Sequence, residues 1–204
     1  MGDARERGEC ASVSAALERA PADSALERDR LDGALARASA LKLMIFDIDG
    51  VMTDGTLYYS EHGEELKAFN VRDGHGVKML KQYGVEVALI TGRRSRAVEL
   101  RAANLRIAHL YQGVEDKRVP YSALLEKLGL SANQCGCMGD DLLDLPLITR
   151  CGFAATVPAA PDAVRSRAHY ITHTRGGHGA VREVCEFILR AQGTLVRAID
   201  AHLQ

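Results

Sequence analysis

The sequence predicts an α/β fold, a doubly wound parallel sheet with helices on both faces, and three observations lead to this prediction. From Leu41 onward, short apolar runs alternate with segments whose apolar residues recur at helical spacing, the pattern of successive βαβ units. The chain has 204 residues, of which 47% are hydrophobic, enough for one sizeable core. Acidic residues and a threonine follow several of the runs, where such a sheet carries its ligand sites.

Six short apolar segments are predicted to form the strands of the sheet. In chain order they are residues 43–46, 85–90, 109–112, 135–138, 152–156 and, as the weakest, 168–171. Five further segments carry helical spacing. They are residues 76–83, 95–104, 117–128, 142–149 and 180–201, the last expected to be one long closing helix.

Residues 56–60 and 65–70 flank a polar segment that contains Gly63, and their alternating pattern predicts a β-hairpin projecting from the sheet. The apolar side chains of this hairpin would form an exposed patch, which favours a subunit interface unless the hairpin folds back onto its own domain. These side chains are Leu57, Tyr58, Tyr59, Leu66 and Phe69.

Residues 1–40 are predicted to be an N-terminal extension of a single domain formed by residues 41–204. The extension is rich in Ala, Arg, Glu and Asp, a composition that favours local helix but buries little. We expect a frayed helix or disorder, with docking onto the domain as the alternative. A docking helix would use a weak apolar stripe of Leu17, Leu26, Leu31 and Leu35, which Pro21 and Gly33 interrupt.

Composition and charge argue against several classes of protein. The chain has 26 basic and 27 acidic residues, a net charge of −1, which gives no reason to expect nucleic acid or a membrane as a partner. No stretch approaches the roughly 20 apolar residues that span a bilayer. The five cysteines form no CxxC pair, so we expect a reducing, cytoplasmic location, with Cys135 and Cys137 packed in a strand.

Candidate reactive groups follow three of the predicted strands, where a doubly wound sheet binds its ligands. Asp47 and Asp49 follow the first strand, and Gly50 permits the tight turn that brings both carboxylates toward one point. Thr91 follows the second strand and Asp140 the fourth. Two carboxylates after a strand can also be ordinary polar residues of a loop. The functional prediction therefore depends on the order in which several motifs follow one another.

Four segments resemble, in order, the motifs of the haloacid dehalogenase superfamily of phosphotransferases. They are FDIDGVMTDG, LITGRR, the Lys117 segment and MGDDLLDLP, and the resemblance covers residues 41 to 195. Three longer stretches resemble the phosphatases of one eight-carbon sugar acid phosphate, 3-deoxy-D-manno-octulosonate 8-phosphate. They are DGTLYYSEHGEELKAFNVRDGHGVKML, HLYQGVEDK and GGHGAVREVCEFILRAQG. The extension and Met52, where a leucine is more usual, depart from the family pattern.

The resemblance implies a role for each matching residue. Asp47 would attack phosphorus to form an aspartyl-phosphate, and Asp49 would protonate the leaving sugar oxygen and then deprotonate the attacking water. Thr91 and Lys117 would bind phosphoryl oxygens. A lysine that opens a helix is usually solvated, so only its place in the motif order favours function for Lys117.

The resemblance also implies a Mg²⁺ cofactor, an ion that prefers hard oxygen ligands. Asp47, the backbone carbonyl of Asp49 and Asp140 would bind it, and Asp141 would hold a metal-bound water. The ion would reduce the repulsion between the nucleophile and the phosphate dianion.

A sugar acid phosphate also carries a carboxylate, so its site needs a further cation. Arg93 and Arg101 are the candidates, because an arginine fork suits a carboxylate, although Arg101 is as readily a solvated surface residue. Gly177 and Gly179 precede the last helix, where they allow the backbone to approach an anion or another subunit.

The intervals between the motifs leave no room for a large cap domain, and capless relatives form tetramers whose subunits help to enclose each site. The resemblance therefore implies a homotetramer that hydrolyses 3-deoxy-D-manno-octulosonate 8-phosphate in lipopolysaccharide biosynthesis. A phosphatase of a related nine-carbon sugar acid phosphate and a non-enzymatic assembly protein are the alternatives.

Overall fold

The fold is built around a sheet of six parallel strands, seen in a computed structural model that describes residues 25–63 and 65–203. The strand order is β5-β4-β1-β6-β7-β8. Every residue of β1 (Leu43–Phe46) is buried, because this strand lies between β4 and β6 and is covered on both faces. The other strands are β4 (Glu86–Ile90), β5 (His109–Tyr111), β6 (Cys135–Met138), β7 (Phe153–Thr156) and β8 (Tyr170–Ile171). The predicted doubly wound parallel sheet is confirmed.

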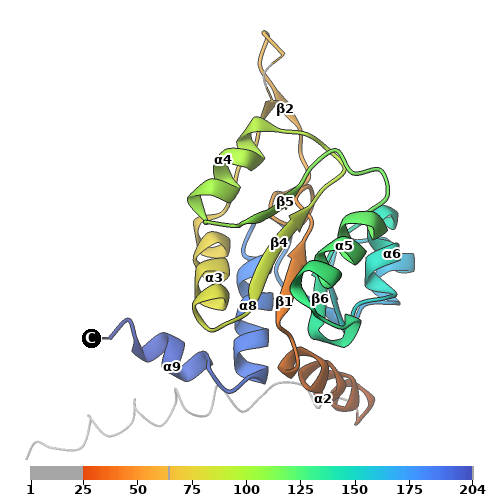
Figure 1. Cartoon of the computed structure of the whole chain (residues 1–204), viewed down its shortest axis with the longest axis vertical. Coiled ribbons are helices and arrows are strands. Elements are labelled where there is room, and N and C mark those ends of the chain that lie inside the picture. The colour runs from red at the N-terminus through yellow and green to blue at the C-terminus, as the bar shows by residue number, and fades with distance from the viewer. Residues whose placement is uncertain (1–24, 64, 204) are drawn as a thin grey trace, which may run out of the picture.

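Helices cover both faces of this sheet (Figure 1). On one face, α3 (Val71–Gln82) packs on α8 (Ala180–Ala191), and on the other, α5 (Arg118–Leu128) packs on α6 (Leu145–Ile148). The chain also forms α4 (Arg96–Asn104), α7 (Asp162–Arg165) and the short 3₁₀ turns η1 (Ala132–Gln134) and η2 (Leu142–Asp144). The predicted helix 142–149 is therefore a 3₁₀ turn followed by a short helix.

Helix α3 begins five residues earlier than residue 76, where the sequence pattern placed its start. Asn70 caps it, with its side chain accepting a hydrogen bond from the Arg72 amide at 2.8 Å. The early turns were missed because they contain glycines, which normally weaken a helix. At Gly76, a Cβ would lie 3.0 Å from the Cα of Arg182, so the glycine allows α3 and α8 to approach closely.

The predicted single closing helix, residues 180–201, is wrong. Helix α8 ends at Ala191, and a separate helix α9 (Leu195–Asp200) follows. Gly193 lies between them with φ 68°, a left-handed conformation that ends helices and favours glycine.

The described part of the N-terminal extension is an ordered helix, α2 (Ala25–Ser39), that packs on α8. Ala34 and Ala38 are buried there, and the guanidinium of Arg37 donates to the carbonyl of Gly152 at 3.1 Å. The expected frayed helix or disorder is therefore wrong for residues 25–39, and the alternative, docking onto the domain, is observed instead. Small alanines allow the close contact, and Leu35 of the predicted stripe packs against the core. Leu17 lies outside the described residues.

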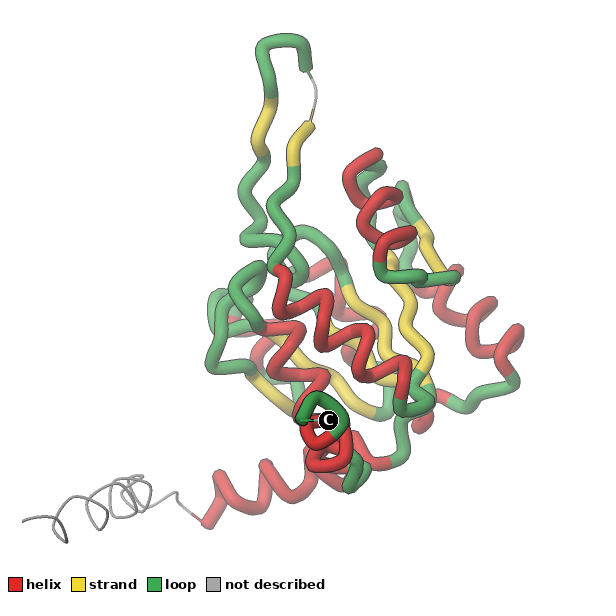
Figure 2. The backbone as a smooth tube through the Cα atoms, turned by 90° about the vertical axis from the view of Figure 1, so that its left-hand side faces the viewer, coloured by secondary structure: helices red, strands yellow, loops and turns green. Residues whose placement is uncertain are grey.

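The hairpin pairs β2 (Tyr58–Tyr59) with β3 (Glu65–Leu66) and projects beyond the carboxyl end of the sheet (Figure 2). Its ladder is shorter than predicted. Leu57, Tyr58, Tyr59 and Leu66 are 41%, 45%, 58% and 60% exposed. Phe69, which was expected in the exposed patch, instead packs half-buried against the core. The part of the chain that the structure describes contains no separate cap domain.

The order of the strands fixes where a site can form. The chain runs from β1 outward to β4 and β5, then returns to the other side of β1 to form β6, β7 and β8. The direction reverses beside β1, and a ligand crevice opens at such a switch point beyond the carboxyl ends of the strands. None of the described helices is long and apolar enough to cross a bilayer.

Candidate active site

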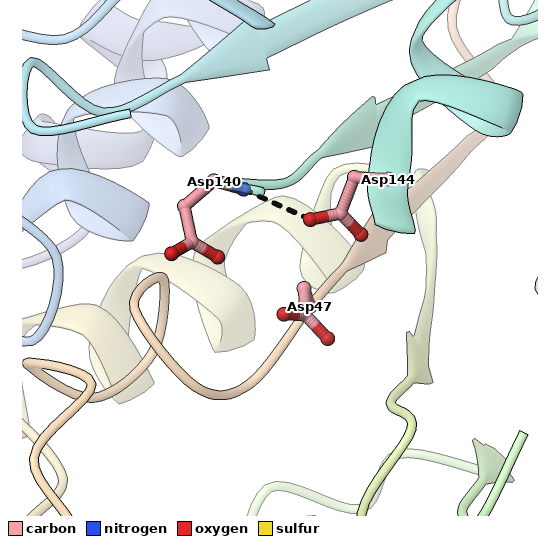
Figure 3. Close-up of side chains that lie close together, drawn as sticks. All are labelled: Asp47, Asp140 and Asp144. Atoms are coloured by element: carbon pink, nitrogen blue, oxygen red, sulfur yellow. Dashed lines mark hydrogen bonds between the residues drawn. The ribbon is translucent and has the colours of Figure 1, made fainter. Parts of the chain in front are cut away.

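Three carboxylates meet at the switch point between β1 and β6. Asp47 directly follows β1, and its amide donates to the carbonyl of Met138 at 3.0 Å, which ties it to the end of β6. Asp140 follows β6, and Asp144 ends η2. Figure 3 shows the three side chains converging. One oxygen of each lies within 4.8 Å of the others. Asp47 is 9% exposed and Asp144 4%, so much of this negative charge is buried.

Lys117 supplies the cation of the cluster. It occupies the N-cap position of α5, and its ammonium group donates to Asp47 Oδ1 at 2.8 Å and to Asp144 Oδ1 at 2.6 Å. Burial lowers the pKa of Lys117, but attraction to the two carboxylates is stronger, so the pKa is raised. Lys117 is therefore a buried, charged member of the site and not a solvated surface lysine.

Asp144 is a member of the site that the sequence analysis did not name. Its Oδ1 accepts from Lys117, and its Oδ2 accepts from the amides of Asp140 and Asp141 at 3.0 and 3.2 Å. Asp144 thus fixes both the lysine and the loop that carries Asp140. The available signal was the third acidic residue of the MGDDLLD segment.

The electrostatics of Asp47 and Asp140 suit a bound cation. Burial, with repulsion from Asp144, raises the pKa of Asp47 to about 6 even though Lys117 opposes the shift. Burial and repulsion from its acidic neighbours raise the pKa of Asp140 to about 7. A cation between the two carboxylates would relieve this repulsion, as the ion at a metal site does.

The geometry of the same residues suits a divalent ion with oxygen ligands. Asp140 Oδ1 is buried and has no hydrogen-bond partner among the described residues. Gly50 has φ 88°, and a Cβ there would lie 2.0 Å from Asp140 Oδ2, so only glycine leaves room for this carboxylate. Because both oxygens of Asp144 are engaged, Asp47 and Asp140 are the pair that fits Mg²⁺.

Asp141 and Asp49 differ in their surroundings. Asp141 is exposed and accepts from the amide of Leu142 at 2.7 Å, which caps η2. Asp49 faces the hairpin, where Lys67 pairs with its Oδ1. The ammonium group of Lys67 also lies 3.2 Å from Glu65 Oε1. Lys67 and Glu65 were not predicted as site residues. In the sequence, only their position in the predicted hairpin could have indicated a role.

Thr91 and Arg93 lie at the end of β4, beside β1. Thr91 is buried, and its amide donates to the carbonyl of Tyr111 at 3.0 Å. The guanidinium of Arg93 donates to Glu65 Oε2 at 2.7 Å and to the hydroxyl of Tyr59 at 2.8 Å. Its Nε lies 4.0 Å from Asp49 Oδ2, which places Arg93 next to the predicted acid–base residue.

Arg101 is not brought to the carboxylates by any contact among the described residues. Its guanidinium donates to the carbonyl of Asn70 at 2.8 Å and lies over the ring of Phe69, 5.6 Å from the ring centre. These contacts fix α4 against the start of α3. Its predicted substrate role would require release from them.

The two predicted glycines have different surroundings. Gly177 donates to the carbonyl of Val51 at 3.0 Å, in the loop that follows Asp49, so it lies beside the site. Gly179 precedes α8 and lies near Thr174 and Arg72.

Gly176, in the same glycine-rich loop, packs most tightly against the loop after Asp49, since a Cβ there would lie 1.8 Å from the carbonyl oxygen of Gly50. A hollow of about 510 Å³ opens beside this contact, and its lining includes Asp54, Asp140, Arg175 and His178.

Known proteins resemble this chain over most of its length. The model of the haloacid dehalogenase-like hydrolases matches residues 107–184. KdsC of Salmonella typhi, a 3-deoxy-D-manno-octulosonate 8-phosphate phosphatase, is 47% identical over 164 residues, which cover 80% of this chain and 87% of the relative. The chain belongs to this phosphatase family.

Solved structures of similar proteins share the fold of this chain. A probable YrbI family phosphatase from Pseudomonas syringae is 49% identical with a TM-score of 0.83, and the match covers 85% of this chain and 98% of that one. The Moraxella catarrhalis phosphatase, solved with magnesium, phosphate and KDO, is 43% identical with a TM-score of 0.82. That match covers 85% of this chain and 99% of the Moraxella chain.

Replacing Lys117 by Met leaves Asp47 and Asp144 buried without their shared cation. In EDTA, we expect the free energy of unfolding to fall by about 3–5 kcal/mol, the usual cost of removing one partner of a buried ion pair. Urea denaturation measures this change. Lys127→Met, an exposed position on the same helix, is the control and should change the value by less than about 0.5 kcal/mol. Equal stability of Lys117→Met and wild type would contradict the buried ion pair.

Proposed function

We propose that this chain is a Mg²⁺-dependent phosphatase that hydrolyses 3-deoxy-D-manno-octulosonate 8-phosphate to the free sugar acid and phosphate. The observation that carries the proposal is the buried Asp47 held by Lys117, with Asp49 two residues further on and Asp140 across the strand end. Family membership supports the substrate, since the Salmonella relative is a phosphatase of this compound. The Moraxella relative was solved with the sugar acid, phosphate and magnesium together.

In the first half of the reaction, Asp47 attacks phosphorus, and the bond between phosphorus and the sugar oxygen breaks. Asp49 donates a proton to that oxygen, because an alkoxide is a poor leaving group. The product is an aspartyl-phosphate on Asp47 and the free sugar acid. In the second half, Asp49 takes a proton from a water molecule that attacks phosphorus. The bond to Asp47 then breaks, which releases phosphate and restores the carboxylate.

The remaining side chains hold the reacting groups in place. Lys117 and Thr91 bind phosphoryl oxygens, and Lys117 already contacts the nucleophile in the described structure. Asp47, the carbonyl of Asp49 and Asp140 would hold Mg²⁺, with Asp141 near a water of that ion. When bound, Mg²⁺ offsets the charge of the carboxylate and the phosphate as they approach.

Arg93 is our candidate for the carboxylate of the sugar acid. Its side chain is 43% exposed, so part of the guanidinium remains open to a ligand while Glu65 and Tyr59 orient the rest. The side chain lies near Asp49, on the side where the leaving sugar would depart. Arg101 and the backbone at Gly177 and Gly179 stay secondary candidates for substrate contacts.

The test of the substrate is phosphate release from a panel of eight- and nine-carbon sugar acid phosphates. We expect the largest kcat/KM for 3-deoxy-D-manno-octulosonate 8-phosphate, loss of turnover in EDTA and recovery on adding Mg²⁺. Asp47→Asn, prepared in parallel, controls for contaminating phosphatases. A larger kcat/KM for a nine-carbon compound would assign the chain to that substrate instead.

We also propose that the chain works as a homotetramer in the cytoplasm. The exposed patch on the hairpin, Leu57, Tyr58, Tyr59 and Leu66, is 41–60% exposed, on an element that projects from the sheet (Figure 2). Exposed apolar patches of this kind mark interfaces. The four described cysteines are buried and unpaired, which suits a reducing compartment.

Polar substitutions in this patch should weaken assembly. Leu57→Ser/Leu66→Ser is expected to shift the protein from tetramer to smaller species in sedimentation velocity, since both side chains lose their apolar contacts. Val119→Ser/Leu143→Ser removes two apolar side chains elsewhere that are more exposed than Leu57 and Leu66, and it should leave the tetramer intact. A wild-type monomer would rule out the proposed assembly.

A further inference from the structure

The stem of the hairpin carries a buried lysine to which the proposed reaction gives no task. Lys67 follows β3, and its side chain is only 1% exposed. Burying an ammonium group costs several kcal/mol unless other groups compensate its charge. Lys67 is compensated twice, by Asp49 and by Glu65, whose Oε1 lies 3.2 Å from the ammonium nitrogen.

These contacts are part of a closed ring of alternating charges. Glu65 accepts a hydrogen bond from Arg93 at 2.7 Å, and this bond lowers the pKa of Glu65 to about 2, so Glu65 is ionised at neutral pH. Arg93 in turn lies 4.0 Å from Asp49 Oδ2. The ring therefore connects three segments: the loop after β1, the hairpin stem and the loop after β4. Its members are Asp49, Lys67, Glu65 and Arg93.

Within this ring, Lys67 is the closest partner of the Asp49 carboxylate. The other oxygen, Oδ2, is buried and has no hydrogen-bond partner among the described residues, and Arg93 is too distant for a hydrogen bond. The direction in which Asp49 points thus depends on Lys67. A proton donor must lie within hydrogen-bond reach of the oxygen that it protonates, so this direction matters for turnover.

We propose that Lys67 is a positioning residue, which holds Asp49 in the orientation from which its carboxyl group reaches the leaving oxygen. The inference rests on the proposed function, because that function gives Asp49 its acid–base role. It assigns to the hairpin stem a task that a cap domain would otherwise perform. It also links the outer end of the hairpin to proton transfer, because any shift of the stem moves Lys67.

A double-mutant cycle separates this role from direct substrate binding. We would measure kcat and KM for wild type, Lys67→Met, Asp49→Asn and the double variant on the sugar acid phosphate. Lys67→Met should lower kcat by about 10- to 100-fold, the scale of a misplaced catalytic group. KM should change by less than about threefold, and the double variant should lie within about threefold of Asp49→Asn. If the kcat losses of the two single variants multiplied in the double variant, or if Lys67→Met changed only KM, the proposal would be overturned.

The leaving group provides a second readout that a purely structural role would not alter. p-Nitrophenyl phosphate releases a stable phenolate without help from an acid, so Lys67→Met should impair its hydrolysis less than that of the sugar phosphate. Equal losses on both substrates would contradict the proposal. If wild type turns over another sugar phosphate better, the proposed substrate fails, and the same cycle on that compound, whose alkoxide also needs a proton, still decides the role of Lys67.

Two further variants guard against misfolding. Lys67→Arg keeps a cation beside Asp49 and should retain more turnover than Lys67→Met. Lys78→Met replaces an exposed lysine on α3 and should match wild type. Unfolding midpoints of all variants show whether the loss of kcat follows the loss of structure, and a strict correlation between the two would overturn the positioning role.

Discussion

The site depends on one arrangement, in which a single ammonium group lies between two buried carboxylates. Lys117 contacts both Asp47 and Asp144, and Asp144 in turn holds the amides of the loop that carries Asp140. If Lys117 were absent, the carboxylates would repel one another in a region from which water is largely excluded. Burial, together with this repulsion, raises the pKa values of Asp47 and Asp140, and a divalent cation is the ligand that would relieve the repulsion.

The hairpin is the second important element, because the described residues contain no cap domain and the hairpin would take over the tasks of one. Its exposed patch would offer a surface to other subunits in the proposed tetramer, and its stem contacts Asp49 through Lys67. Both subunit assembly and the orientation of Asp49 would then depend on this one short hairpin. A phosphoenzyme site benefits from exclusion of bulk water, and neighbouring subunits covering the hairpin would provide it.

The sheet could be predicted, because apolar periodicity indicates where strands lie. The positions of the site residues could also be predicted, because ligand sites lie at the carboxyl ends of the strands, where Asp47, Thr91 and Asp140 are found. The start of α3 could not be predicted, because a glycine such as Gly76 normally disfavours a helix. Only the structure shows that α8 packs closely against it. The order of residues 25–39 was also hidden, because it depends on alanines that contact a distant helix.

The contacts of Lys67 and Asp144 were hidden for a related reason. Each side chain acquires its meaning from partners remote in sequence: Lys67 lies 18 residues from Asp49, and Asp144 lies 27 residues from Lys117. Periodicity and local motifs carry no information on such pairs. Burial of a charged side chain, visible only in the structure, was the signal that identified both.

The central claim is that Asp47 carries the phosphoryl group during turnover. Acid quenching during steady-state hydrolysis, followed by peptide mass spectrometry, tests it most directly. The account predicts one phosphoryl group on the peptide that contains Asp47 and its absence in Asp47→Asn. In Asp49→Asn it should accumulate with p-nitrophenyl phosphate, whose phenolate leaves without an acid while the water is no longer activated. A phosphoryl group on another residue, or full turnover by Asp47→Asn, would contradict the account.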